Sequence, residues 1–186
     1  AGDTSVDVAI VGAGLTGLWT AYYLRRADPT LRIVVIEREH VGFGASGRNG
    51  GWCSALLPMS LETLAARHGR GAAIRMQETM NDTVVEVVRI CEEEGIDAHV
   101  AHGGTVDLAR DRAQVARARA HLESWRSFGL GDEHLRWLDA DEAVEHCGAT
   151  QVLGALFSPH CATVHPARLV HGVASASMRR GVVIHE

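Results

Sequence analysis

Residues 6–39 constrain the fold more than any other part of the chain, and they read VDVAIVGAGLTGLWTAYYLRRADPTLRIVVIERE. The apolar run Val8–Val11 predicts a short strand that is buried on both faces. Three glycines in a GxGxxG pattern follow it at once, and apolar residues then recur at helical spacing as far as Asp28 and Pro29. A second apolar run, Ile33–Ile36, predicts a second strand. This order of elements predicts a βαβ unit with parallel strands, and hence an α/β fold.

The glycines of the turn are spaced as in dinucleotide-binding sites, where each has a physical task. Gly12 permits a tight turn, Gly14 has no side chain to keep a pyrophosphate from the backbone, and Gly17 lets the helix pack against the strand. Leu15 and Thr16 lie between the last two glycines, in the first helical turn. The unpaired N–H groups of that turn and the positive end of the helix dipole attract phosphate. The turn therefore predicts a nucleotide site.

An acidic residue, Glu37, follows the second predicted strand directly. It is expected to accept hydrogen bonds from the hydroxyl groups of an adenosine ribose. A carboxylate at this place disfavours a 2′-phosphate, so NADP is disfavoured even though Arg38 is adjacent. NAD and FAD both fit these residues, which leave the choice between them open.

The segment Gly42–Gly51 reads GFGASGRNGG and lies just beyond this acid. A flexible linker would be polar and featureless, whereas this segment holds an aromatic residue, Arg48 and Asn49 among its glycines. Ser46 is suited to cap a short helix that begins at Gly47. The segment therefore predicts a backbone that lies close to a flat, anionic cofactor.

With the segment Gly44–Gly51, the sequence resembles FAD-dependent oxidoreductases of the D-amino-acid oxidase superfamily. It is most similar to the branch of amine oxidases that are like γ-glutamylputrescine oxidase, which carries such a motif shortly after its ribose-binding acid. The resemblance implies FAD as the cofactor, with this segment along its pyrophosphate and isoalloxazine edge. The residues then expected to bind the cofactor are Gly12, Gly14, Leu15, Thr16, Gly17, Glu37, Arg38, Ser46, Arg48, Asn49, Gly50 and Gly51.

The resemblance also implies an enzyme that oxidises the C–N bond of a small-molecule amine or amino acid to an imine, with oxygen as the electron acceptor. It points to no catalytic acid or base among these residues. Two alternatives stay open. One is a nucleotide-binding fragment or subunit without catalysis, and the other is an NAD-dependent dehydrogenase, which the GRNGG segment disfavours.

The remaining sequence predicts helices over residues 61–94, after Asp111 and from Pro166, and strands at Val152–Phe157 and Val182–Ile184. Asp139 with Glu142 predicts a capping box. The expected fold is an incomplete Rossmann-like FAD-binding domain with an inserted α+β portion of a substrate domain. Residues 1–60 and 166–186 are assigned to the FAD-binding domain. Residues 61–165 are assigned to a helical region and part of the substrate domain. The resemblance covers only the front of the family pattern, so the expected partner is a second chain or a missing C-terminal half.

The composition excludes several classes of function. The net charge is −5 and all 18 basic residues are arginine, so neither nucleic acid nor a catalytic lysine is expected. The four cysteines are scattered, and no apolar run is long enough to span a bilayer. These features predict a cytoplasmic protein that is not bound to a membrane. His99 and His102 have the spacing of a weak metal pair but no third ligand near them, and no metal is expected.

Overall fold

The computed structural model describes residue 3 and residues 5–186, which form two compact units. Unit 1 consists of the chain up to Trp52 together with residues 89–100 and 164–186. Unit 2 consists of residues 53–88 and 101–163. The predicted domain bounds at residues 60 and 165 stay a prediction.

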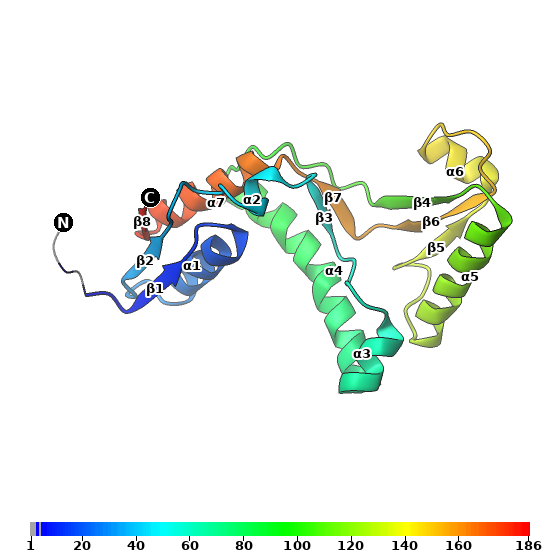
Figure 1. The fold of residues 1–186 in the computed structure, drawn as a ribbon, viewed down its shortest axis with the longest axis horizontal. Coiled ribbons are helices and arrows are strands. Elements are labelled where there is room, and N and C mark those ends of the chain that lie inside the picture. The colour runs from blue at the N-terminus through cyan, green and yellow to red at the C-terminus, as the bar shows by residue number, and fades with distance from the viewer. Residues whose placement is uncertain (1–2, 4) are drawn as a thin grey trace. The chain divides into compact units, whose positions relative to one another are not determined.

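Unit 1 contains the predicted βαβ motif and a parallel sheet (Figure 1). The sheet has the strand order β1-β2-β8, and β2 pairs in parallel with both of its neighbours. Two long helices, α1 and α7, pack against each other in this unit. The elements that lie wholly in it are β1 (Val8–Val11), α1 (Leu15–Ala27), β2 (Ile33–Ile36), α2 (Ala45–Arg48), α7 (Pro166–Arg179) and β8 (Val183–His185).

The sheet of unit 1 buries one of its faces and exposes the other. Along β2, Ile33 and Val35 are buried whereas Ile36 is 47% exposed. Val11 at the end of β1 is 88% exposed, and Val183 in β8 is 51% exposed. The prediction that Val8–Val11 is buried on both faces is therefore wrong, because side chains alternate across a strand and only one set is covered.

A buried ion pair joins the helices of unit 1. The carboxylate of Glu94, just after α4 (Arg70–Glu93), accepts a hydrogen bond from the hydroxyl of Tyr22 at 2.7 Å and one from Arg179 at 3.0 Å. Arg180 contacts the same carboxylate. The side chain of Glu94 is only 8% exposed, so its charge depends on these partners.

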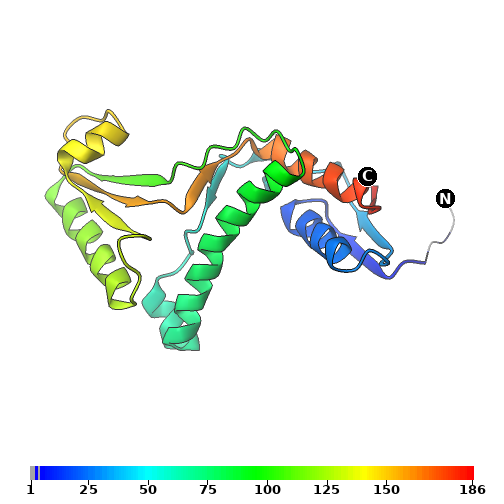
Figure 2. The same ribbon diagram turned by 180° about the vertical axis from the view of Figure 1, so that it is seen from behind.

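Unit 2 contains a three-stranded antiparallel sheet and a two-stranded sheet (Figure 2). A three-stranded sheet has the order β4-β6-β5, and a two-stranded sheet pairs β3 with β7. Asp111 caps α5, and Asp139 with Glu142 forms the predicted capping box of α6. The elements that lie wholly in unit 2 are α3 (Leu61–His68), β4 (Thr105–Ala109), α5 (Arg112–Ser127), β5 (Arg136–Leu138), α6 (Ala140–His146), β6 (Gly154–Ser158) and β7 (Cys161–Thr163). The unit also holds β3 (Trp52–Ser54) except for Trp52, and the first part of α4.

Residues 61–94, which the sequence predicts to be helical, form two helices, α3 and α4. The backbone of Gly69 has a φ of +87°, which ends α3 before α4 begins. Only glycine adopts this conformation without strain.

A polar network in unit 2 joins α4 to three loops. The side-chain amide of Gln77 donates to the carbonyl of Ala55 at 3.1 Å and to Asn81 Oδ1 at 3.0 Å. The Asn81 amide therefore donates to His134 Nδ1, at 3.2 Å. His134 Nδ1 also lies 2.9 Å from His160 Nε2.

Candidate cofactor-binding site

The turn between β1 and α1 needs glycine at two places for different reasons. Gly12 has a φ of +101°, and a Cβ added there would meet nothing within 4 Å, so conformation alone selects glycine. At Gly17 a Cβ would lie 2.1 Å from the carbonyl oxygen of Gly12 and 3.2 Å from the side chain of Ile10. The helix therefore packs on the strand only because residue 17 has no side chain.

The N-terminus of α1 is open to an anion. Gly14 is its N-cap, makes no side-chain cap, and is followed by no acidic residue in the first turn, where Leu15 and Thr16 lie. The first N–H groups of a helix have no partner within the helix, and the helix dipole adds positive charge. This end of α1 can therefore bind phosphate through its backbone.

Ser46 lies at this helix end, although its sequence separation from α1 is large. Its hydroxyl accepts a hydrogen bond from the N–H of Leu15 at 2.9 Å. A Cβ at Gly14 would lie 2.9 Å from the same hydroxyl, so Gly14 leaves room for Ser46 as well as for a ligand. The prediction that Ser46 caps a helix starting at Gly47 is wrong, because α2 begins at Ala45 and its N-cap residue is Gly44.

The carboxylate of Glu37 holds the glycine-rich turn and the loop that follows β2. One of its oxygens accepts the N–H of Ala13 at 2.9 Å, and the other accepts those of Arg38 and Glu39 at 2.9 and 3.0 Å. The bond from Ala13, followed by that from Glu39, lowers the pKa of Glu37, so the group is ionised at neutral pH. The side chain of Arg38 is exposed and pairs with Glu39.

The glycine-rich segment is a packed turn rather than a linker. Gly42 has a φ of +72°, its N–H donates to the carbonyl of Ala13 at 3.0 Å, and its own carbonyl accepts the N–H of Gly47 at 3.1 Å. A Cβ at Gly47 would lie 2.4 Å from that carbonyl oxygen, and one at Gly42 would lie 2.5 Å from the side chain of Val170. The segment thus follows both the glycine-rich turn and α7 closely.

The side chain of Asn49 closes α2. Its amide nitrogen donates to the carbonyls of Ala45 and Ser46 at 3.2 and 2.9 Å, and its oxygen accepts the N–H of Gly51 at 2.8 Å. The guanidinium of Arg48 lies over the ring of Phe43, 4.7 Å from its centre. The side chains of Arg48 and Asn49 are both exposed.

The last two glycines of the segment differ in their surroundings. A Cβ at Gly50 would meet nothing within 4 Å, which leaves open space beside the backbone. Gly51 has a φ of +75°, and a Cβ there would lie 2.1 Å from the carbonyl oxygen of Val164. The structure therefore brings the twelve predicted residues into one region of unit 1, while their contact with a cofactor stays a prediction.

The sequence missed the pairings that hold this region together. The partners of Glu37, Ser46 and Gly42 are backbone groups of Ala13 and Leu15, distant in sequence, and the only sequence signal for them is the density of glycine. The geometry fits a dinucleotide. The N-terminus of α1 offers N–H groups, and the carboxylate of Glu37 bonds to the same turn. A Cβ at Gly12, Gly44 or Gly50 would meet nothing within 4 Å, which leaves room for a ligand.

Comparison with known proteins shows the family of the chain. Residues 7–186 match the family described as FAD dependent oxidoreductase (DAO). The chain belongs to this family. It is 31% identical to gamma-glutamylputrescine oxidoreductase of Escherichia coli K12 over 181 residues, which are 97% of this chain and 41% of that protein. It is 22% identical to mitochondrial sarcosine dehydrogenase of Homo sapiens, over 98% of this chain and 18% of that protein.

Solved structures agree with the family. Glycine oxidase from Geobacillus kaustophilus has a TM-score of 0.73 and 26% identity, over 97% of this chain and 46% of that one. L-amino acid deaminase from Proteus vulgaris has a TM-score of 0.76 and 21% identity, over 100% of this chain and 45% of that one, and shows the fold alone. The predicted resemblance and the α/β fold class are confirmed. The chain spans less than half the length of these DAO family proteins.

Two histidines considered for a metal have other surroundings. The ring of His99 packs against that of His165. His102 Nε2 lies 3.1 Å from the carbonyl of Pro159. Within residue 3 and residues 5–186, no three histidine, cysteine, aspartate or glutamate side chains are grouped to hold a metal ion, and no helix is both long and apolar enough to cross a membrane.

Proposed function

We propose that this chain binds FAD through the glycine-rich turn, Glu37 and the segment Gly42–Gly51. The observation that carries the proposal is the open N-terminus of α1, with the ionised Glu37 carboxylate anchored on the same turn. Membership of the FAD dependent oxidoreductase family supports FAD rather than NAD. The backbone N–H groups of the first turn of α1 would hold the pyrophosphate, and Glu37 would accept the ribose hydroxyls.

The polar side chains of the segment have a positioning role in this proposal. Ser46 fixes α2 against the first turn of α1, and Asn49 fixes the chain between α2 and Gly51. The open space at Gly50 and the exposed guanidinium of Arg48 leave both residues available to a bound cofactor. The protein thus supplies binding and orientation, while redox chemistry belongs to the cofactor.

We further propose that the substrate is a small amine or amino acid, because the names of several relatives specify such compounds. Bound FAD would supply a two-electron acceptor for a hydride from the carbon next to nitrogen, and loss of a proton from the nitrogen would leave the imine. Dioxygen would then take the two electrons and two protons and leave as hydrogen peroxide. The proposed location is the cytoplasm, which fractionation of cells for flavin-dependent activity would check.

The visible absorption spectrum of the purified chain, reconstituted with FAD, tests the binding. Bound flavin gives bands near ~375 and ~450 nm that remain with the protein on gel filtration. Gly14→Val should abolish them, because a side chain there meets Ser46 at 2.9 Å and closes the approach to the backbone. Gly148→Val is the matched control, since a Cβ at Gly148 meets nothing within 4 Å. Flavin retained by a folded Gly14→Val variant would refute the assignment of this turn.

A second candidate is nucleotide binding without catalysis, in partnership with another chain. The observation that favours it is that the chain spans only 41% of its relative from Escherichia coli. Hydrogen peroxide release from the flavin-loaded chain, on addition of a panel of amines and amino acids, separates the two. Bound flavin with no peroxide and no bleaching of the flavin bands under any substrate supports binding alone.

A further inference from the structure

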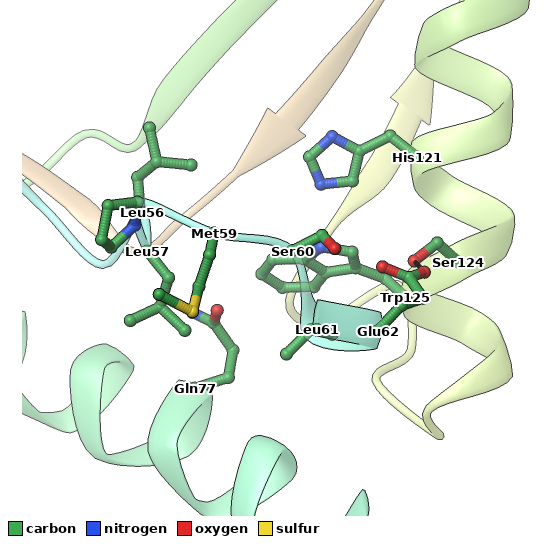
Figure 3. A pocket seen from close by; sticks show the side chains of 11 residues that line it. Leu56, Leu57, Met59, Ser60, Leu61, Glu62, Gln77, His121, Ser124 and Trp125 are labelled. Atoms are coloured by element: carbon green, nitrogen blue, oxygen red, sulfur yellow. Dashed lines mark hydrogen bonds between the residues drawn. The ribbon is translucent and has the colours of Figure 1, made fainter. Parts of the chain in front are cut away.

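Unit 2 contains a cavity that uses none of the twelve predicted cofactor residues. Its volume is about 390 Å³. Three segments line it: the loop from Leu56 to Ser60, the start of α3, and the face of α5 that carries His121, Ser124 and Trp125 (Figure 3). Gln77 of α4 lines its remaining side.

One end of the cavity carries a negative charge. The carboxylate of Glu62 accepts a hydrogen bond from the hydroxyl of Ser124, and this bond lowers the pKa of Glu62. Glu62 is therefore ionised at neutral pH. It is the single carboxylate among the lining residues, which include no arginine. Its neighbours are the hydroxyls of Ser124 and Ser60, the first turn of α3 and His121, and a charged carboxylate beside a cavity favours a cationic ligand.

The other part of the cavity is apolar and unusually exposed. Leu56 is 59% exposed and Met59 is 36% exposed, and the indole of Trp125 lies across the cavity from them (Figure 3). Such a surface gains free energy when an apolar body covers it. The face of an indole also attracts a cation.

Hydrogen bonds at Ala55 and Leu56 fix the start of the loop that carries the apolar residues. The carbonyl of Ala55 accepts a hydrogen bond from the buried Gln77 amide at 3.1 Å, and its N–H donates to the carbonyl of His160 at 3.1 Å. The N–H of Leu56 donates to the hydroxyl of Ser54 at 3.0 Å. The apolar wall is therefore held in place before any ligand arrives, which lowers the cost of binding.

We propose that this cavity binds an organic ammonium ion, with its charged nitrogen at Glu62 and its hydrocarbon body between Trp125 and the loop. The site goes beyond the proposed cofactor function, since all of its residues belong to unit 2. Its ligand needs no flavin, and so binding is measurable whether or not the flavin proposal holds.

Isothermal titration of the 186-residue chain without flavin tests the proposal, with hexylammonium, hexan-1-ol and hexanoate as probes. Hexylammonium should bind saturably, hexan-1-ol about fivefold more weakly, and hexanoate more weakly still, because an exposed ion pair contributes up to about that factor. Glu62→Gln should weaken hexylammonium by about fivefold and leave hexan-1-ol unchanged. Glu123→Gln is the matched control, because Glu123 lies on α5 outside the cavity with 70% of its side chain exposed.

A second variant tests the apolar wall without risk to the core. Leu56→Ser removes an exposed side chain, so folding should be retained, whereas hexylammonium affinity should fall at least threefold and hexan-1-ol affinity should fall in parallel. No measurable heat with hexylammonium, equal affinities for hexylammonium and hexan-1-ol, or a Glu62→Gln variant that binds hexylammonium as tightly as the parent overturns the proposal.

Discussion

Replacing Gly17 by alanine should destabilise the protein even though alanine is the better helix former. A Cβ at position 17 would lie 2.1 Å from the carbonyl oxygen of Gly12 and 3.2 Å from Ile10. The first contact is with backbone, which cannot rotate away. The helix α1 would have to move off β1, and the glycine-rich turn would open with it.

The magnitude follows from two opposing contributions. Alanine in place of a helical glycine stabilises by about 1 kcal/mol. Overpacking against a rigid neighbour costs about 3 kcal/mol, at the upper end of its usual range. The net effect is a loss of about 2 kcal/mol, which corresponds to a fall of about 1 M in the urea midpoint for a slope near 2 kcal/mol/M.

The chain offers a matched control in Gly71, which lies in the first turn of α4 as Gly17 lies in that of α1. A Cβ there would approach only the end of the flexible Arg75 side chain, at 3.3 Å. Gly71→Ala should therefore leave the urea midpoint unchanged or raise it by up to about 0.5 M. A Gly17→Ala variant that is as stable as the parent in urea denaturation followed by circular dichroism would refute the reasoning.

Two other outcomes follow from the contacts of the two units. Ser46→Ala should lower the free energy of unfolding by about 1 kcal/mol, because it removes the acceptor of the Leu15 N–H. Ser175→Ala is the control and should change it little, because that exposed hydroxyl bonds within its own helix. Thermal denaturation of the two variants tests this difference. Burial first, and then His134, lowers the pKa of His160, so the unfolded chain binds its proton more tightly. The stability that this group contributes is therefore complete above about pH 6.5, and it is lost as the pH falls below that value. The urea midpoint should decrease with pH in this range, and His160→Asn should make that decrease smaller.

The βαβ motif was predictable from sequence because its physics is local. The spacing of Gly12, Gly14 and Gly17 dictates a turn, and apolar runs on either side dictate strands. The capping box of Asp139 with Glu142 is equally local, and it was confirmed. In these cases the partners lie within a few residues of each other, so their pattern is visible in the chain.

What the sequence missed depends on partners that are distant along the chain. An apolar run such as Val8–Val11 is compatible with burial on one face or both, and the difference depends on which elements pack there. The hydroxyl of Ser46 resembled a local helix cap, but its partner is the N–H of Leu15, 31 residues away.

The predicted cofactor-binding residues have two different tasks. Some of them hold the glycine-rich turn in place, and others leave room for the cofactor. Glu37, Ser46 and Asn49 each accept a hydrogen bond from a backbone N–H group of the turn or of the segment. Their effect is to fix the open N-terminus of α1 beside a charged carboxylate, so that little ordering remains to be done when a dinucleotide binds. Loss of Ser46 or Asn49 should therefore weaken flavin binding through the geometry of the turn, whereas blocking Gly14 removes the place where the pyrophosphate lies.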